Sequence, residues 1–353
     1  MNLRTFSLGA LWSATTLCSL LASATAQVVF EPKPGPGMGK EVVFVLGDDE
    51  YFSEEGGPLL ARILAEKHGF RTTLCFSTHP ETGVIAQSEK TNIPGLESLR
   101  KADLMVVFTR FRMLQDAQMR EIVEYLDSGR PVIGLRTATH AFAYPSNSES
   151  PYAKYSWNNK NPDFEGGFGR QVLGETWVSH WGAHGKQATR GIVAPGAGQH
   201  PILRGIGDGD IFGPTDVYEV RLPLLPGAVP LVLGQVLKSM DLKDEPVGPE
   251  TDAKTGKTKE KNQPMLPVAW VRTYRGASGK EGRVFASTMG GKMSGKRDWD
   301  SEGFRRLFVN AAYWCTGLEG SIPGKSDVEP VGSTEAFKRG VKAADALRET
   351  LGR

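Results

Sequence analysis

The stretch Pro131-Val132-Ile133-Gly134-Leu135-Arg136-Thr137-Ala138-Thr139-His140-Ala141-Phe142 decides the fold. A short apolar run opens into small residues and then a helical-looking segment, the pattern of a strand that turns sharply into a helix. In open α/β sheets such turns lie at the carboxyl ends of the strands, where these folds bind their ligands. The apex of a nucleophile elbow is Ser or Cys, whereas the apex here is Arg136. The stretch therefore predicts a ligand site that lacks the usual nucleophile.

Outward from this turn, strand patterns alternate with helix patterns. Buried strands are predicted over residues 42–46, 71–76, 104–108 and 132–135. Helical spacing of apolar residues follows the first strand and the third, and each helix is closed by a glycine, Gly69 and Gly129. Strands alternating with helices at this pitch favour βαβ units. The predicted fold class is α/β, with a doubly wound, mostly parallel sheet.

The second half of the chain contains shorter strand patterns and a final amphipathic helix. The strands are predicted over 217–220, 230–236, 267–274 and 283–287, and the helix over 304–315. Residues 241–263 are charged and poor in large apolar side chains, which predicts a surface insertion. The segment 321–353 is predicted to be a polar tail with one weak helix.

The first 26 residues have the composition of a secretory signal peptide. They hold one basic residue, an apolar core and an Ala24-Thr25-Ala26 cleavage pattern. We therefore expect an exported protein, periplasmic or extracellular, with no membrane span in the mature chain. A membrane anchor is the alternative, although the apolar stretch is short for one.

Composition excludes several partners. With 42 basic and 40 acidic residues, the chain offers no electrostatic case for binding nucleic acid. No G-x-G-x-x-G follows a strand, so we expect no nucleotide cofactor. Cys75 and Cys315 lie in apolar runs and are either buried free thiols or one long-range disulfide. The sequence does not fix the oligomeric state.

Carboxylates cluster directly after the first predicted strand, with Asp48, Asp49, Glu50, Glu54 and Glu55 inside eight residues. Asp49 and Glu50 are candidates for a general acid or base, or for binding a cation or a polyhydroxyl ligand. The alternative for Glu54 and Glu55 is that they stabilise the amino end of the next helix.

Two of the six histidines, His180 and His184, lie four residues apart. Gly182 and Gly185 argue against a helix there, but a loop can still bring the two imidazoles together. With Asp216, which precedes a short strand, they would suit a divalent ion such as zinc. His140 is expected to be a third histidine beside His180 and His184. The alternative is that each histidine bonds a buried backbone group.

Eight aromatic residues fall between Tyr144 and Trp181. Flat apolar faces with polar edges suit a sugar ring. The alternative is that a long loop needs a small core of its own.

Taken in order, several motifs resemble the trehalose-utilisation (ThuA-like) family. The matching pieces are Gly47-Asp48-Asp49-Glu50-Tyr51, Gly134 to His140, His180-Trp181-Gly182-Ala183-His184-Gly185, His200-Pro201-Ile202, Thr215-Asp216-Val217-Tyr218, Pro267 to Trp270, and Gly282 through Trp314. The resemblance covers residues 37–320, read as one ThuA-like domain. It implies the class I glutamine-amidotransferase-like, flavodoxin-like fold and a role in carbohydrate metabolism, on sugars or oxidised (keto-) sugars. The amidotransferase cysteine is absent, so glutamine hydrolysis is not expected. Gly290-Gly291 stands where many relatives have Gly-His.

Two function classes remain open. The first is an enzyme on a small carbohydrate, a hydrolase or an isomerase, that uses a metal or His/carboxylate acid–base chemistry. Its catalytic candidates are Arg136, His140, Asp49 and Glu50, and its metal candidates are His180, His184 and Asp216. The second is a non-catalytic carbohydrate-binding or accessory protein. Convergence of the histidines and Asp216 would favour the enzyme.

Overall fold

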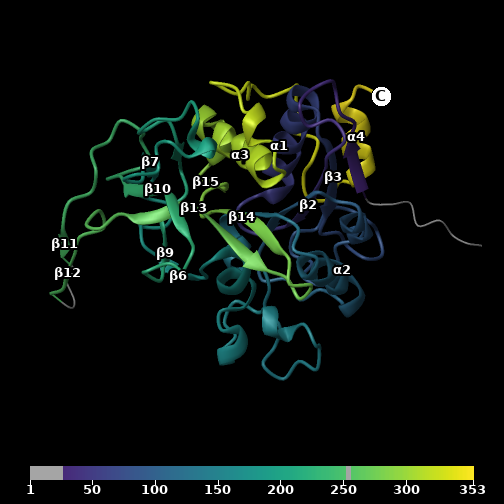
Figure 1. Ribbon diagram of the computed structural model, residues 1–353, viewed down its shortest axis with the longest axis horizontal. Helices are drawn as coiled ribbons and strands as arrows, with labels where there is room; N and C mark the ends of the chain where they lie inside the picture. The colour runs from purple at the N-terminus through teal and green to yellow at the C-terminus, as the bar shows by residue number, and fades with distance from the viewer. Residues whose placement is uncertain (1–26, 252–255) are drawn as a thin grey trace, which may run out of the picture.

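The computed structural model describes residues 27–251 and 256–353 (Figure 1). Its centre is a ten-stranded mixed sheet in the order β1-β3-β2-β4-β5-β14-β13-β10-β7-β8. The parallel part consists of β3 (Arg71–Phe76), β2 (Glu41–Gly47), β4 (Leu104–Thr109), β5 (Val132–Leu135) and β14 (Glu281–Ser287). All four strands predicted in the first half of the chain lie within it, and the α/β fold class is confirmed.

Antiparallel strands extend this parallel part at both edges. On one side follow β13 (Leu266–Arg275), β10 (Val229–Val236), β7 (Thr189–Val193) and β8 (Phe212–Gly213). On the other side β1 (Gln27–Phe30) pairs with β3. The sheet is therefore wider than its parallel βαβ part.

Helices cover both faces of the parallel strands. α1 (Ser53–His68) and α3 (Glu302–Cys315) lie together on one face, and α2 (Asp116–Asp127) lies on the other (Figure 1). Successive residues of β2 point into the hydrophobic cores on opposite faces of the sheet. Phe44 packs into the core on the side of α1 and α3, and Val45 packs into the core on the side of α2. α1 ends at Gly69 because the chain there has φ 80° and a Cβ would lie 2.9 Å from the backbone of Gly35.

The turn after β5 differs from its prediction in one respect. Arg136 is at the apex, in a left-handed conformation with φ 44°. The helix expected to follow is only the 3-10 turn Arg136–His140. The helix stops because residues 141–143 pair with the backbone of Arg112, which exchanges hydrogen bonds with Ala141 and Ala143.

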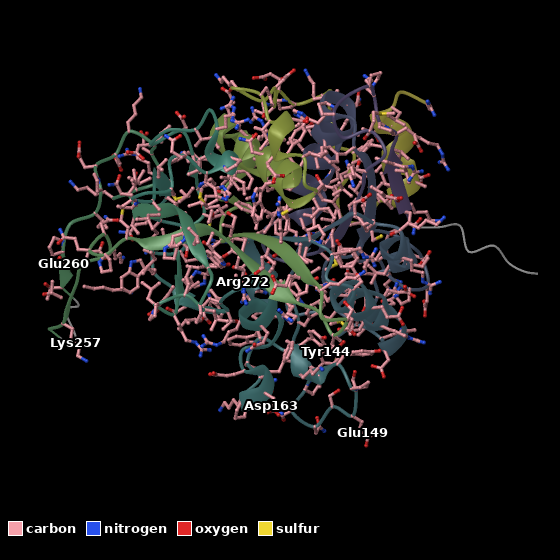
Figure 2. All side chains as sticks on the ribbon, in the orientation of Figure 1. Tyr144, Glu149, Asp163, Lys257, Glu260 and Arg272 are labelled. Atoms are coloured by element: carbon pink, nitrogen blue, oxygen red, sulfur yellow. The ribbon has the colours of Figure 1, made fainter. Side chains whose placement is uncertain are left out.

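Smaller elements complete the chain. These are β6 (Trp177–His180) paired with β9 (Tyr218–Val220), β11 (Glu250–Thr251) with β12 (Thr258–Lys259), β15 (Lys292–Met293) with β16 (Lys296–Arg297), and α4 (Ala343–Thr350). The β11/β12 hairpin of the insertion stands out from the body, with Lys257 and Glu260 at its outer end (Figures 1 and 2). Its base is anchored, since Lys261 is buried and its ammonium donates to Gln187.

The segment after Gly320 is polar, yet it packs on the body. Phe337 is fully buried and stacks on Phe76 of β3 with 5.7 Å between ring centroids. Both cysteines of the described part of the chain, Cys75 and Cys315, are buried free thiols. Burial raises the pKa of the Cys75 thiol to about 12.

The predicted signal peptide, residues 1–26, lies outside the described residues and stays a prediction. Within the described ranges, no helix has the length and apolar character that a membrane span needs.

Candidate active site

Arg136 is the anchor of the site. Its guanidinium is fully buried and lies 3.6 Å from the ring centroid of Tyr218. One terminal nitrogen donates to the carbonyls of Asp216 and Thr288, both at 2.7 Å. The other donates to the Tyr51 hydroxyl and to Asp216 Oδ1, both at 3.0 Å. The apex residue therefore fixes both the backbone and the side chain of Asp216.

Asp216 joins this anchor to the two histidines. His180 Nδ1 lies 2.7 Å from Oδ2, and His184 Nδ1 lies 3.2 Å from Oδ1. Burial alone would raise the pKa of Asp216, but the charge of Arg136 and the two imidazole hydrogen bonds hold it well below its usual range. Because a carboxylate only accepts hydrogen bonds, both Nδ1 atoms carry a proton.

His184 lies between two carboxylates. Its Nδ1 faces Asp216, and its Nε2 is 3.4 Å from Glu50 Oε1. The hydrogen bond to Asp216 raises the pKa of His184, with a further contribution from Glu50. Both histidine side chains are partly exposed, at 35% for His180 and 39% for His184. They are thus accessible from solvent while their carboxylate partner Asp216 is not.

Asp49 and Glu50 belong to a charged network at the end of β2. Arg110 contacts both, with 2.7 Å to Glu50 and 3.3 Å to Asp49. Lys90 also pairs with Asp49. Burial alone would raise the pKa of Asp49, but Lys90 and the arginines hold it below its usual value. Of the two predicted carboxylates, Glu50 is the one in contact with a histidine.

His140 lies beneath this group and contacts no carboxylate in the part of the chain that the structure describes. It is buried, and its ring lies 5.0 Å from Trp177 and 5.8 Å from Tyr218, centroid to centroid. Burial lowers the pKa of His140 well below the ordinary value. His140 is therefore a neutral part of the site's inner wall, whereas His180 and His184 are the histidines in contact with a carboxylate.

The donor set of His180, His184 and Asp216 suits a divalent ion in kind. One ligand atom from each lies within 4.8 Å of the others. Both Asp216 oxygens, however, already accept hydrogen bonds, and Arg136 balances the carboxylate charge. An ion bound there would compete with these donors for the carboxylate oxygens. The arrangement as it stands is that of an aspartate orienting two imidazoles.

A model of the ThuA family, described as trehalose utilisation, matches residues 75–315. The chain belongs to the ThuA family. Membership implies a role in trehalose utilisation and, more broadly, in carbohydrate metabolism. The fold and the family expected from the sequence are thus confirmed.

Two solved ThuA-like proteins are similar to this ThuA-family chain. The one from Parabacteroides merdae is 14% identical, with a TM-score of 0.45 and coverage of 84% of this chain and 94% of that one. The one from Bacteroides uniformis is 12% identical, with a TM-score of 0.47 and coverage of 81% and 95%. Among curated proteins, none matches this chain.

The structure also explains the departure at Gly290-Gly291. A Cβ on Gly291 would lie 2.8 Å from the ring of Tyr51, so Tyr51 occupies the space that a side chain would need. Both glycine amides donate to the buried Asp298, which also accepts from Thr215, the neighbour of Asp216. This position supports the site through its backbone.

Sequence reasoning missed Tyr51, Tyr218, Arg110 and Asp298. Tyr51 and Tyr218 lie inside quoted motifs, so their place beside Asp49, Glu50 and Asp216 was a usable signal. Arg110 and Asp298 had none, because each acts across a long separation in sequence.

Proposed function

We propose that this protein is an acid–base enzyme that transfers protons on a sugar or keto-sugar, as a hydrolase or an isomerase. The observation that carries the proposal is Asp216, a buried carboxylate anchored by Arg136 that accepts a hydrogen bond from each of two partly exposed imidazoles. An orienting carboxylate of this kind fixes the tautomer of a histidine and stabilises its charged form.

The two histidines differ in their surroundings, which gives them different roles. His180 donates through Nδ1 to Asp216, which turns its other ring nitrogen, Nε2, away from that carboxylate, the arrangement of a general base. His184 faces Asp216 with one nitrogen and Glu50 with the other, so its protonated form has an acceptor on each side. Its raised pKa fits a general acid. The ring centroids are 4.5 Å apart, close enough to serve one substrate.

A metal-dependent form is the second candidate, favoured by the clustering of the three donor atoms. In that form His180, His184 and Asp216 would hold the ion, which would supply an activated water or polarise a carbonyl. A non-catalytic sugar-binding protein is the remaining alternative.

The test is turnover of neutral disaccharides and their keto derivatives, followed by NMR, with the variants His180→Gln and His184→Gln. We expect each variant to lose activity by about 10²–10⁴-fold, the usual contribution of general acid–base catalysis. The matched control is His79→Gln, since His79 is exposed and outside the site. Unchanged activity in both site variants would refute the proposal.

Metal analysis of the purified protein separates the two enzymatic forms. Stoichiometric zinc that is lost in His184→Gln, with activity abolished by a chelator, would replace the acid–base form by the metal form. Saccharide binding without turnover in the wild type would favour the accessory protein.

A further inference from the structure

We propose that Phe111, Trp157 and Trp177 form an aromatic wall on which a neutral pyranose ring stacks, while Arg110 and Glu50 bind its hydroxyl groups. The inference rests on the proposed function, because the wall leads directly to the histidine pair. It adds what that site recognises: an uncharged sugar with one flat C–H face.

The wall is continuous. Ring centroids are 5.7 Å apart for Phe111 and Trp157, and 5.5 Å apart for Trp157 and Trp177. Trp177 then lies 5.8 Å from His180. All three wall residues are half-buried, so each keeps part of its surface in contact with solvent. They come from distant parts of the chain, Phe111 just after β4 and Trp177 in β6.

Polar side chains continue the wall back to its start. His184 follows His180, Glu50 follows His184 at 3.4 Å, and Arg110 follows Glu50 at 2.7 Å. The Arg110 guanidinium carbon lies 4.6 Å from the Phe111 ring centroid. The contacts therefore form a closed circle of side chains, one half of which is aromatic and the other half polar. Such a division suits a pyranose, which has apolar faces and a hydroxyl-bearing edge.

A buried inner layer supports this circle of side chains. His140 lies 4.9 Å from Phe111 and 5.0 Å from Trp177, and Tyr218 lies 5.5 Å from His180, centroid to centroid. Two buried aromatic side chains thus lie behind these partly exposed residues. Among the described residues, Trp177 Nε1 is buried without a hydrogen-bond partner. A ligand hydroxyl could supply that missing acceptor.

The backbone of Phe111 is held in an unusual conformation. Its φ is 50°, a left-handed value that is strained for a bulky residue. Backbone hydrogen bonds hold it: Phe111 N donates to His140 O at 3.0 Å, and Arg112 N donates to Ala141 O at 2.7 Å. Such outliers gather at functional sites. Here the left-handed backbone directs the Phe111 ring toward Trp157 and His140.

The wall differs from the core of the aromatic loop. That core is formed by Tyr144, Tyr155 and Phe168, which are buried in the cluster beneath α2. Trp157 and Trp177 stay partly exposed on the side of the histidines. The charge of Arg110 is already matched by Glu50, so these two side chains offer donors and acceptors as an ion pair and leave no unpaired charge for an ionic ligand. This is why a neutral saccharide is expected.

The test is calorimetric binding of trehalose, sucrose and glucuronate to the full chain carrying His180→Gln, which removes turnover. We expect Trp157→Ala and Arg110→Gln each to weaken binding of a neutral sugar by about tenfold or more. Trp314→Ala is the matched control, a half-buried tryptophan on α3 outside the circle of side chains, and should leave binding unchanged. Melting curves identify any variant that fails to fold, and Trp157→Phe should then keep most of the affinity.

The outcomes separate the two proposals. Unchanged affinity in Trp157→Ala and Arg110→Gln, no binding of either neutral sugar, or preferential binding of glucuronate would each overturn the wall. If the wall variants lose binding while His180→Gln keeps turnover in an otherwise wild-type chain, the wall stands and the acid–base proposal fails.

Discussion

Replacing Arg136 with methionine tests whether the apex residue holds the site together. Methionine has an unbranched side chain of comparable length to the aliphatic part of arginine, but it lacks the guanidinium. Asp216 and Thr288 then lose the donor to their carbonyls, and Asp216 Oδ1 loses its ion-pair partner. Tyr51 loses a hydrogen bond and Tyr218 a cation over its ring.

The expected loss of stability is large because both members of the ion pair are buried. Removing one partner of such a pair costs about 3–5 kcal/mol, since the other charge is left without compensation. The two histidines still face Asp216 and keep the loss within that range. For a slope of about 3 kcal/mol per molar urea, the midpoint should fall by about 1–1.7 M.

The assay is urea unfolding of the wild type, Arg136→Met, Asp216→Asn and the double variant. The double variant should be more stable than the sum of the single effects predicts, by at least about 1 kcal/mol, because it leaves no orphan carboxylate. A loss below about 1 kcal/mol in Arg136→Met, or strictly additive effects, would refute the account of Arg136 as the anchor.

Three further predictions follow from other parts of the structure. Lys261→Met should loosen the loop of residues 181–187, because Lys261 Nζ donates to Gln187 Oε1 at 2.8 Å and that oxygen also accepts from the Ala183 amide. We expect faster proteolysis at residues 181–187 in this variant than in the control Lys257→Met. Equal rates would contradict the prediction. Burial lowers the pKa of His68, His140 and His200, so the unfolded chain binds more protons and stability should fall as pH drops below about 6.5. His184 has the opposite sign, so the fall should steepen in His184→Gln, and a melting temperature that rises from pH 7 to 5.5 would contradict the assignment. Cys75 and Cys315 should resist a thiol reagent in the folded chain and react only after denaturation, since burial raises the pKa of both thiols.

The parallel part of the sheet could be predicted because its strands are apolar on both faces. The segment 132–135 is predicted with its observed bounds for that reason, and 71–76 is predicted as well although it begins with Arg71, Thr72 and Thr73. The 3-10 turn after β5 could not be, since it depends on pairing with Arg112, a contact that no local pattern encodes. The left-handed Phe111 is similar, because only tertiary hydrogen bonds hold a phenylalanine there.

The sequence predicted which residues belong to the candidate site, but it did not predict which of them contact one another. Sequence reasoning grouped His180, His184 and Asp216 by chemistry, and the structure brings them within hydrogen-bond distance. It predicted a catalytic role for Arg136 at the apex; in the structure the side chain is fully buried and donates to Asp216 Oδ1, the geometry of a residue that positions this carboxylate. The partner of a buried charge lies 80 residues away here, and spacing carries no record of such a pair.

The charge balance of the site decides which chemistry it supports best. Each of the two carboxylates around His184 has its own arginine: Arg136 pairs with Asp216, and Arg110 pairs with Glu50. The carboxylate charges are therefore compensated before any ligand binds. A divalent cation would add two positive charges beside two guanidiniums, whereas a proton on His184 adds one charge that both carboxylates can accept. The pair of arginines thus favours a site in which a proton is the mobile charge, and a neutral sugar is the ligand that leaves this balance intact.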